Sequence, residues 1–188
     1  MMTVSLCVVA YNEASFLPHL LRDFEAQTYP HALIEVVLVD GNSTDKTREI
    51  MQDFAQHADS FAGVVVLDNP RRVQAAGWNE AITHSTGEVI IRIDAHTHIP
   101  PEFTEKNMAL QEKGEYVTGG VRPCIIEQPT PWKVTLLEVE NSMFGSSVSK
   151  GRKGTQCGYV KSLFHAAYRR EVFEKAGLFN PRLLRTED

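Results

Sequence analysis

Cysteines and long hydrophobic runs are both scarce in this 188-residue sequence. The three cysteines, Cys7, Cys124 and Cys157, lie far apart and form no C-x-x-C pair, which argues against a disulfide framework and against a cysteine-based zinc site. Every apolar run is shorter than the roughly 20 residues that a transmembrane helix requires. The first residues have no basic stretch ahead of their apolar segment, so they are not expected to be a secretory signal. The cytoplasm is therefore the expected compartment.

Two common nucleotide-binding motifs are also missing. No G-x-G-x-x-G follows the first apolar segment, and the chain has no G-x-x-x-x-G-K-[ST]. A dehydrogenase with the dinucleotide fingerprint and a P-loop kinase are both disfavoured. The net charge of -5 argues against a nucleic-acid partner. Every charged residue between positions 145 and 170 is nevertheless basic, which suits a solvated loop or a surface that meets an anion.

What the chain does contain is a regular alternation of strand-like and helix-like segments. Strands are expected over residues 4–10, 34–39 and 63–67, and a fourth within the stretch 87–96, where the apolar run covers residues 89–93. Three helical patterns separate them: the first carries Phe16 on its apolar face, the second begins at a cap supplied by Ser43, Thr44 or Asp45, and the third covers residues 73–85. Such alternation predicts a Rossmann-like α/β fold, with a mostly parallel sheet and helices on both faces.

Beyond residue 98 the pattern changes. Further helices are expected over residues 102–113, 130–144 and 170–176, and further strands over residues 116–121 and 162–168. A chain of this length, with 43% hydrophobic and 23% charged residues, fits one globular domain.

Polar side chains follow the fourth expected strand directly. The run from Gly87 ends in Asp94-Ala95-His96. Because ligands of open α/β sheets bind outside the carboxyl ends of the strands, these two potential metal ligands could meet a phosphate-bound cation. Taken alone, the tripeptide is better explained as an aspartate-containing turn.

Four segments taken together resemble the family 2 glycosyltransferases. They are residues 8–13 (VVAYNE), residues 39–47 (VDGNSTDKT), residues 87–96 and Thr186-Glu187-Asp188. Residues 92–96 and 168–173 are most similar to those of bacterial succinoglycan-type exopolysaccharide transferases. The resemblance implies the GT-A nucleotide-diphospho-sugar transferase fold over the whole chain.

The resemblance also implies how the domain is organised. Residues 1–98 would form a nucleotide-binding half and residues 99–188 an acceptor-side half of one domain. Because the family continues beyond the position of Asp188, often with membrane helices in the exopolysaccharide subgroup, the chain is expected to be truncated at its C-terminus. The full-length protein would then work at the inner face of the plasma membrane.

In the family, the ends of the first two strands hold the uridine. The resemblance thus implies that Tyr11 and Glu13 lie near the base and that Asp40 accepts a base N–H. Arg72 and Gln74 would contact the nucleotide from the start of the third helix. Other readings stay open: a packing aromatic for Tyr11, a cap or Asx-turn for Asp40, and solvated surface for Arg72 and Gln74.

Asp94 and His96 occupy the place of the family's D-x-D motif, so they would hold a divalent cation, Mn²⁺ or Mg²⁺, against the diphosphate. Imidazole is better tolerated by Mn²⁺ than by Mg²⁺, so His96 biases the metal choice or leaves Asp94 as the main ligand. Asp188 matches the family's catalytic base, and Glu187 lies beside it.

The function implied is that of an inverting glycosyltransferase. It would move a sugar from a nucleotide-diphospho-sugar, expected to be a UDP-sugar, to a saccharide or lipid-linked acceptor in bacterial exopolysaccharide or cell-surface polysaccharide synthesis. The alternative is a non-catalytic nucleotide-sugar-binding module or an inactive fragment. A nucleotidyltransferase would need a glycine-rich basic loop after the first strand, and residues 10–15 contain none.

Overall fold

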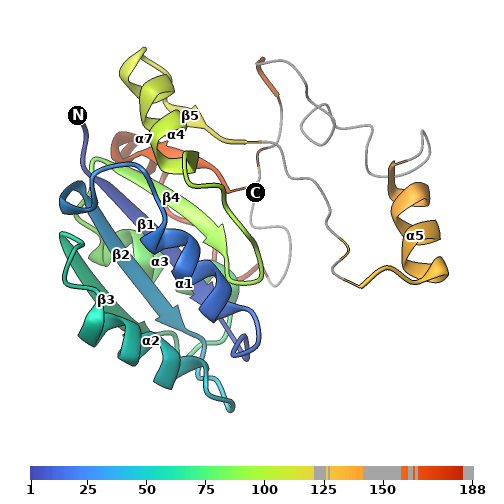
Figure 1. The fold of residues 1–188 in the computed structure, drawn as a ribbon. Coiled ribbons are helices and arrows are strands. Elements are labelled where there is room, and N and C mark those ends of the chain that lie inside the picture. Colours follow the sequence, from blue (N-terminus) through green and yellow to red (C-terminus); the bar gives the residue numbers. More distant parts are fainter. Residues whose placement is uncertain (121–125, 127, 142–157, 161–162, 164, 184–188) are drawn as a thin grey trace. The chain divides into compact units, whose positions relative to one another are not determined.

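A computed structural model of the chain describes residues 1–120, 126, 128–141, 158–160, 163 and 165–183 (Figure 1). The chain divides into two compact units, Met1–Thr118 together with His165–Asp188, and Gly119–Phe164. Both predicted halves contribute to the first unit, because residues 165–183 join residues 1–118 there. The functional division at residue 98 stays a prediction.

The first four strands of the larger unit pair in parallel and follow the predicted pattern to within one residue at each end. They are β1 (Val4–Ala10), β2 (Ile34–Asp40), β3 (Gly63–Asp68) and β4 (Val89–Asp94). Helices α1 (Leu17–Glu25), α2 (Thr47–His57) and α3 (Gln74–His84) connect them, and a short 3-10 helix, η1 (His31–Leu33), precedes β2. β1 lies between β2 and β4, and β3 lies outside β2.

Two short antiparallel strands complete the sheet, in the order β3-β2-β1-β4-β6-β5. β6 (Ala167–Arg169) pairs with β4, and β5 (Val117–Thr118) pairs with β6. Both are shorter than the strands predicted over 116–121 and 162–168; residues 121, 161–162 and 164 lie outside the described part. Helix α4 (Phe103–Glu112) precedes β5, and α7 (Arg170–Ala176) ends at Gly177, whose φ is 84°.

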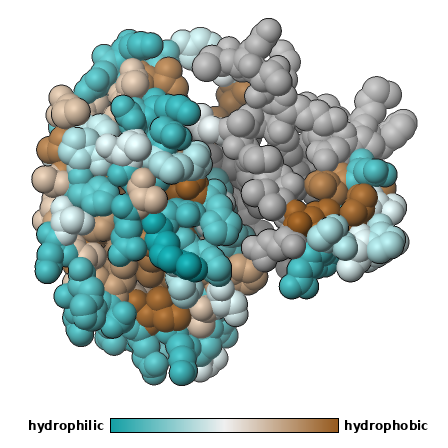
Figure 2. Space-filling view, viewed as in Figure 1, coloured by the Kyte–Doolittle hydropathy of each residue, from teal (hydrophilic) through white to brown (hydrophobic). Residues whose placement is uncertain are grey.

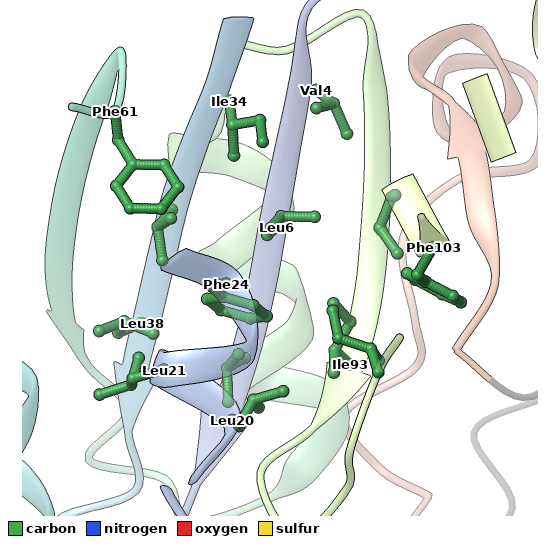
Figure 3. Close-up of a cluster of buried hydrophobic side chains, with 14 of the residues drawn as sticks. Val4, Leu6, Leu20, Leu21, Phe24, Ile34, Leu38, Phe61, Ile93 and Phe103 are labelled. Atoms are coloured by element: carbon green, nitrogen blue, oxygen red, sulfur yellow. The ribbon is translucent and has the colours of Figure 1, made fainter. Parts of the chain in front are cut away.

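Apolar side chains cover both faces of the sheet, as predicted. On one face, Leu6, Leu38 and Ile93 pack with residues of α1, α2 and α4, including the fully buried Phe24 (Figure 3). On the other face, a second cluster joins strands β1, β2 and β4 to α3, where Trp78 is 1% exposed. Figure 1 shows α1 and α3 on opposite sides of the strands.

Phe16 departs from the predicted apolar face of the first helix. Its side chain is 48% exposed, and it precedes α1 instead of forming part of it. Pro18 lies in the first turn, where its fixed φ and missing N–H are tolerated, so the helix begins at Leu17. Phe16 is therefore left at the N-cap position, outside the packed stripe.

The second unit contains helix α5 (Pro131–Asn141), which confirms the helix predicted over 130–144 as far as residue 141. Apolar side chains along it are exposed, among them Trp132, Leu136 and Val139. Figure 2 shows hydrophobic residues on the surface of the described part of the chain. Among the described residues, no helix is long and apolar enough to cross a membrane. Most of the basic segment noted in the sequence, including Lys150, lies outside them.

Candidate active site

A cleft of about 240 Å³ opens at the carboxyl ends of the parallel strands. The cleft lies between the neighbouring strands β1 and β4. From β1 the sheet continues through β2 to β3 in one direction, whereas β4 lies in the other direction. Open α/β sheets bind ligands where the strand order reverses in this way. The residues that line it are Val9, Ala10, Tyr11, Glu13, Gly41, Asn69, Arg72, Gln74, Asp94, Ala95 and His96. Six of the predicted site residues are therefore brought together in one cleft: Tyr11, Glu13, Arg72, Gln74, Asp94 and His96.

The loops that follow β1 and β2 are joined by hydrogen bonds. The Oδ1 atom of Asn12 accepts the Thr44 N–H at 2.8 Å, and the Asn12 N–H donates to Ser43 Oγ at 3.0 Å. The Glu13 N–H donates to Thr47 Oγ1 at 2.8 Å. Asn12 has a φ of 55°, a conformation that asparagine adopts more readily than most residues. Asn12 therefore shapes the turn after β1.

Asp45 strengthens this connection. The N-cap position of α2 is occupied by Lys46, and not by any of the three residues predicted to cap the helix. Asp45 precedes it and binds Thr47, the first residue of α2. Its carboxylate accepts the N–H of Thr47 at 3.0 Å and the Thr47 hydroxyl at 2.5 Å, while its other oxygen accepts the Ala14 N–H at 3.1 Å. The hydrogen bond from the Thr47 hydroxyl is the largest cause of the lowered pKa of Asp45. The ionised carboxylate therefore holds the two loops together.

Asp40 lies at the end of β2 and is 2% exposed. Its two carboxylate oxygens share the N–H of Ser43 at 3.3 and 3.2 Å, which is the turn contact left open from the sequence. Arg48 Nη1 lies 3.9 Å from Asp40 Oδ2 and also pairs with Asp68. One N–H leaves most lone-pair sites of a carboxylate available, so the turn does not exclude a base contact. The base contact stays a prediction.

Tyr11 and Arg72 face each other at the cleft. The Tyr11 side chain is 48% exposed, and the Arg72 guanidinium carbon lies 5.5 Å from its ring centroid. Arg72 also donates from Nη2 to the backbone oxygen of Asn42 at 3.3 Å. An exposed aromatic face beside a held cation is able to stack a planar base and meet an anionic phosphate.

The predicted metal ligands line the cleft at the end of β4: Asp94 is the last residue of the strand and His96 follows it. His96 Nδ1 is 3.2 Å from Glu13 Oε1, a contact that the sequence did not suggest. No group of three or more metal-binding side chains forms within the described ranges. A cation carried on a diphosphate needs only one or two protein ligands, because phosphate oxygens and waters complete its shell. Asp94 and His96 fit such a shared site, but not an all-protein cage.

Two residues that shape the site were missed from the sequence: Asn69, which lines the cleft, and Gly77, which lies behind its lining. Asn69 is 2% exposed; its Nδ2 donates to the Val73 oxygen at 2.9 Å, while its Oδ1 has no hydrogen-bond partner among the described atoms. Gly77 lets α3 approach β1, since a Cβ there would lie 2.6 Å from Val9 Cγ1. Asn69 follows the third strand as Tyr11 follows the first, so its position was the available signal.

Glu187 and Asp188, the predicted catalytic pair, lie outside the described residues. The segment that leads to them is fixed at Phe179. Asn79 donates from Nδ2 to the Phe179 oxygen at 2.8 Å and accepts the Phe179 N–H at 2.9 Å. The Arg92 guanidinium lies 4.5 Å from the Phe179 ring centroid. Residues of α3 and β4 thus hold this segment, and the catalytic pair stays a prediction.

A sequence model described as glycosyl transferase family 2 matches residues 5–177. The chain belongs to this family. The succinoglycan biosynthesis protein ExoA of Rhizobium meliloti is 30% identical to this family 2 chain over 193 residues, which cover 99% of the chain and 56% of ExoA. The undecaprenyl-phosphate 4-deoxy-4-formamido-L-arabinose transferase of Pseudomonas savastanoi pv. phaseolicola is 38% identical over 131 residues, 69% of this chain and 38% of that protein. The chain thus spans about half the length of ExoA and less of the second relative.

Solved structures of other glycosyltransferases confirm the predicted GT-A fold. S. aureus TarS 1–349 in complex with UDP superposes with a TM-score of 0.73 at 20% identity, over 99% of this family 2 chain and 52% of that one. The mannosyltransferase PcManGT from Pyrobaculum calidifontis, in complex with GDP-Man and Mn²⁺, gives a TM-score of 0.68 at 25% identity, over 97% and 49%.

Proposed function

We propose that this chain is the donor-binding and catalytic part of a bacterial inverting glycosyltransferase. It transfers a sugar from a UDP-sugar to a saccharide or lipid-linked acceptor in the synthesis of an exopolysaccharide or another cell-surface polysaccharide. The observation that carries the proposal is the single cleft that gathers Tyr11, Arg72, Asp94 and His96 at the switch point of the sheet. All the lining residues named for this cleft belong to residues 1–98, and residues 99–188 serve the acceptor side.

The residues of the site contact different parts of the UDP-sugar donor. Tyr11 stacks on the base, Asp40 accepts a base N–H, and Arg72 faces the ribose-phosphate. Asp94 and His96 hold the divalent cation, which when bound neutralises charge on the departing diphosphate. The position of Asp94 at the carboxyl end of β4 supports this role.

The transfer is an in-line displacement at the anomeric carbon. Asp188 takes the proton of the acceptor hydroxyl while the hydroxyl oxygen bonds to the anomeric carbon. The bond from that carbon to the diphosphate oxygen breaks, and its electron pair leaves with the nucleoside diphosphate. Attack from the face opposite the leaving group inverts the configuration.

Names of the relatives support the substrate classes. One is called an undecaprenyl-phosphate transferase and another a succinoglycan biosynthesis protein, which favours a lipid-linked or polysaccharide acceptor. A structural neighbour was crystallised with UDP-GlcNAc. A lipid-linked acceptor would bring the full-length protein to the inner face of the plasma membrane, through regions beyond those matched by this chain.

Donor binding is tested by thermal unfolding. UDP with Mn²⁺ at about 100 times the dissociation constant should stabilise the chain by about 2.7 kcal/mol and raise its Tm by roughly 5–10 °C. Asp94→Ala should remove the Mn²⁺-dependent part of the shift. Asp59→Ala, which removes an exposed carboxylate between α2 and β3, is the matched control and should keep the whole shift. A wild-type Tm that no nucleoside diphosphate moves would refute donor binding.

Turnover separates the enzyme from a non-catalytic module that holds nucleotide-sugar without transferring it. A chain extended beyond residue 188 should release UDP from a UDP-sugar only when an acceptor is supplied. Asp188→Asn should reduce that rate by at least 100-fold, because it removes the base but keeps the shape of the side chain. UDP binding without turnover in the extended wild type would favour the module.

A further inference from the structure

His165 occupies an unusual place where β6 meets β4. Ile91 pairs with Ala167, and the next contact along β4 is the Arg92 N–H donating to the Ala166 oxygen at 3.1 Å. At Asp94 the backbone N–H donates instead to the Nδ1 atom of the His165 ring, at 3.4 Å. A side chain therefore replaces the backbone acceptor at the last residue of β4.

The second ring nitrogen of His165 contacts Thr97, at the far end of the loop that begins at Asp94. Nε2 lies 3.2 Å from the Thr97 hydroxyl oxygen. Because Nδ1 accepts the Asp94 N–H, the ring proton lies on Nε2, from which it donates to Thr97. One imidazole thus connects the first and last residues of the Asp94–Thr97 loop, which includes His96.

The backbone of His165 supports a role of this kind. Its φ is 49°, in the left-handed region, which is sterically unfavourable for a residue other than glycine. Such conformations persist where the surroundings hold them, and they gather at ligand-binding sites. The conformation turns the ring, in place of the peptide group, toward the end of β4.

We propose that His165 is the positioning residue of the Asp94–His96 metal clamp. By fixing the Asp94 main chain and the far end of the loop, it sets the direction of the Asp94 carboxylate toward the donor diphosphate. This inference rests on the proposed function, because it assumes that the clamp meets a diphosphate-bound cation. The buried Ala95, 3% exposed, holds the same loop from the core side.

The proposal is tested with three substitutions in the whole chain. In His165→Asn, the side-chain Oδ1 can lie near the position of the histidine Nδ1 and accept the Asp94 N–H. In His165→Gln, the side-chain Nε2 can lie near the position of the histidine Nε2 and donate to Thr97. Ala can do neither. Mn²⁺ affinity of the UDP complex is measured from the free-ion signal in electron paramagnetic resonance, and metal-free UDP affinity by calorimetry. His57→Ala, on the exposed surface of α2, is the matched control.

His165→Ala should weaken Mn²⁺ binding to the UDP complex about 10-fold, at the low end of the loss seen when the partner of a metal ligand is removed. Metal-free UDP affinity should stay within about twofold, since the contact acts on the clamp and not on the base site. His165→Asn should recover most of the loss, and His57→Ala should bind Mn²⁺ as the wild type does. A lower Tm alone, without a change in Mn²⁺ affinity, would reduce His165 to a structural role and overturn the proposal.

Two further results would also decide the matter. Unchanged Mn²⁺ binding in His165→Ala overturns the proposal. Recovery of Mn²⁺ affinity in His165→Gln but not in His165→Asn also overturns it, because the effect would then come from the contact with Thr97. Failure of the wild type to bind UDP or Mn²⁺ is a different result, because it refutes the proposed function itself before any variant is compared.

Discussion

At the scale of single residues, Gly77 controls how closely α3 approaches the cleft. A Cβ at this position would lie 2.6 Å from Val9 Cγ1 and 3.0 Å from Asn69 Nδ2, and both residues line the cleft. Alanine would improve helix propensity by about 1 kcal/mol, whereas overpacking costs about 1–3 kcal/mol. The steric effect should dominate, because the distance to Val9 is far below normal contact.

We therefore expect Gly77→Ala to lower the free energy of unfolding by about 1–2 kcal/mol in urea titrations and to weaken UDP binding. Gly63→Ala is the matched control, since its added Cβ meets nothing within 4 Å and should leave both quantities unchanged. A Gly77→Ala variant as stable as the wild type would show that α3 shifts away without loss.

Residues such as Tyr11 and Asp94 could be predicted because each directly follows an apolar run that forms a strand. Position relative to a strand end is local information. His165 could not be predicted, since its contact to Asp94 depends on a left-handed backbone conformation and spans 71 residues of sequence. The pairing of His96 with Glu13 could not be predicted either, because it depends on how two loops lie across the cleft.

At the scale of elements, the loops after β1 and β2 act as one body because side chains of each bind the backbone of the other. The Asp45 carboxylate accepts hydrogen bonds from the Ala14 N–H in the first loop and from the Thr47 N–H and hydroxyl at the start of α2. Because the pKa of this carboxyl is lowered, its contribution to stability depends on pH. A carboxyl with a lower pKa in the folded chain stabilises it above the unfolded value of 3.8, and this contribution is lost as pH falls through the folded pKa.

Urea unfolding between pH 6 and pH 2.5 should therefore show a steeper loss of stability in the wild type than in Asp45→Asn, whose amide does not titrate. The difference should be constant above about pH 5 and shrink below pH 4. Asp59→Asn, at an exposed site between α2 and β3, should follow the wild type. Parallel curves for wild type and Asp45→Asn would contradict the proposed role of the charge.

Elements with a strong local signal were predicted well and the others poorly. The strands β1 and β4 are mostly apolar, interrupted by Ser5 in β1 and by Arg92 and Asp94 in β4, as expected of strands covered on both faces. β5 has two residues and β6 three, so neither presents a period long enough to bound it. Their limits depend on Gln111, which is fully buried and donates to the Ala167 oxygen at 3.0 Å, a contact between distant segments.

At the scale of the whole molecule, the sheet is completed by a strand from near the end of the chain. β6 covers the edge of β4, and Arg170 binds the Gly87 oxygen at 2.9 Å and the Ser85 oxygen at 2.9 Å. A chain cut after residue 164 would expose the apolar edge of β4, and an exposed apolar strand edge promotes aggregation.

We expect the chain cut after residue 164 to aggregate or to lose cooperative unfolding, measured by light scattering and near-ultraviolet circular dichroism. A chain cut after residue 183 keeps β6, α7 and the Phe179 contacts, so it should unfold cooperatively while lacking Glu187 and Asp188. Cooperative unfolding of the shorter chain would show that β6 is dispensable for the sheet.

The late arrival of β6 also bears on how the protein is made. Asp94 leaves the ribosome 71 residues ahead of His165, a delay of roughly 4–14 s at synthesis rates of about 5–20 residues per second. During this interval the residues of the four parallel strands have been synthesised, but those of β6, which pairs with the edge of β4, have not. The edge of β4 that β6 covers in the folded chain is thus exposed for some seconds of each synthesis, and an exposed apolar strand edge favours aggregation.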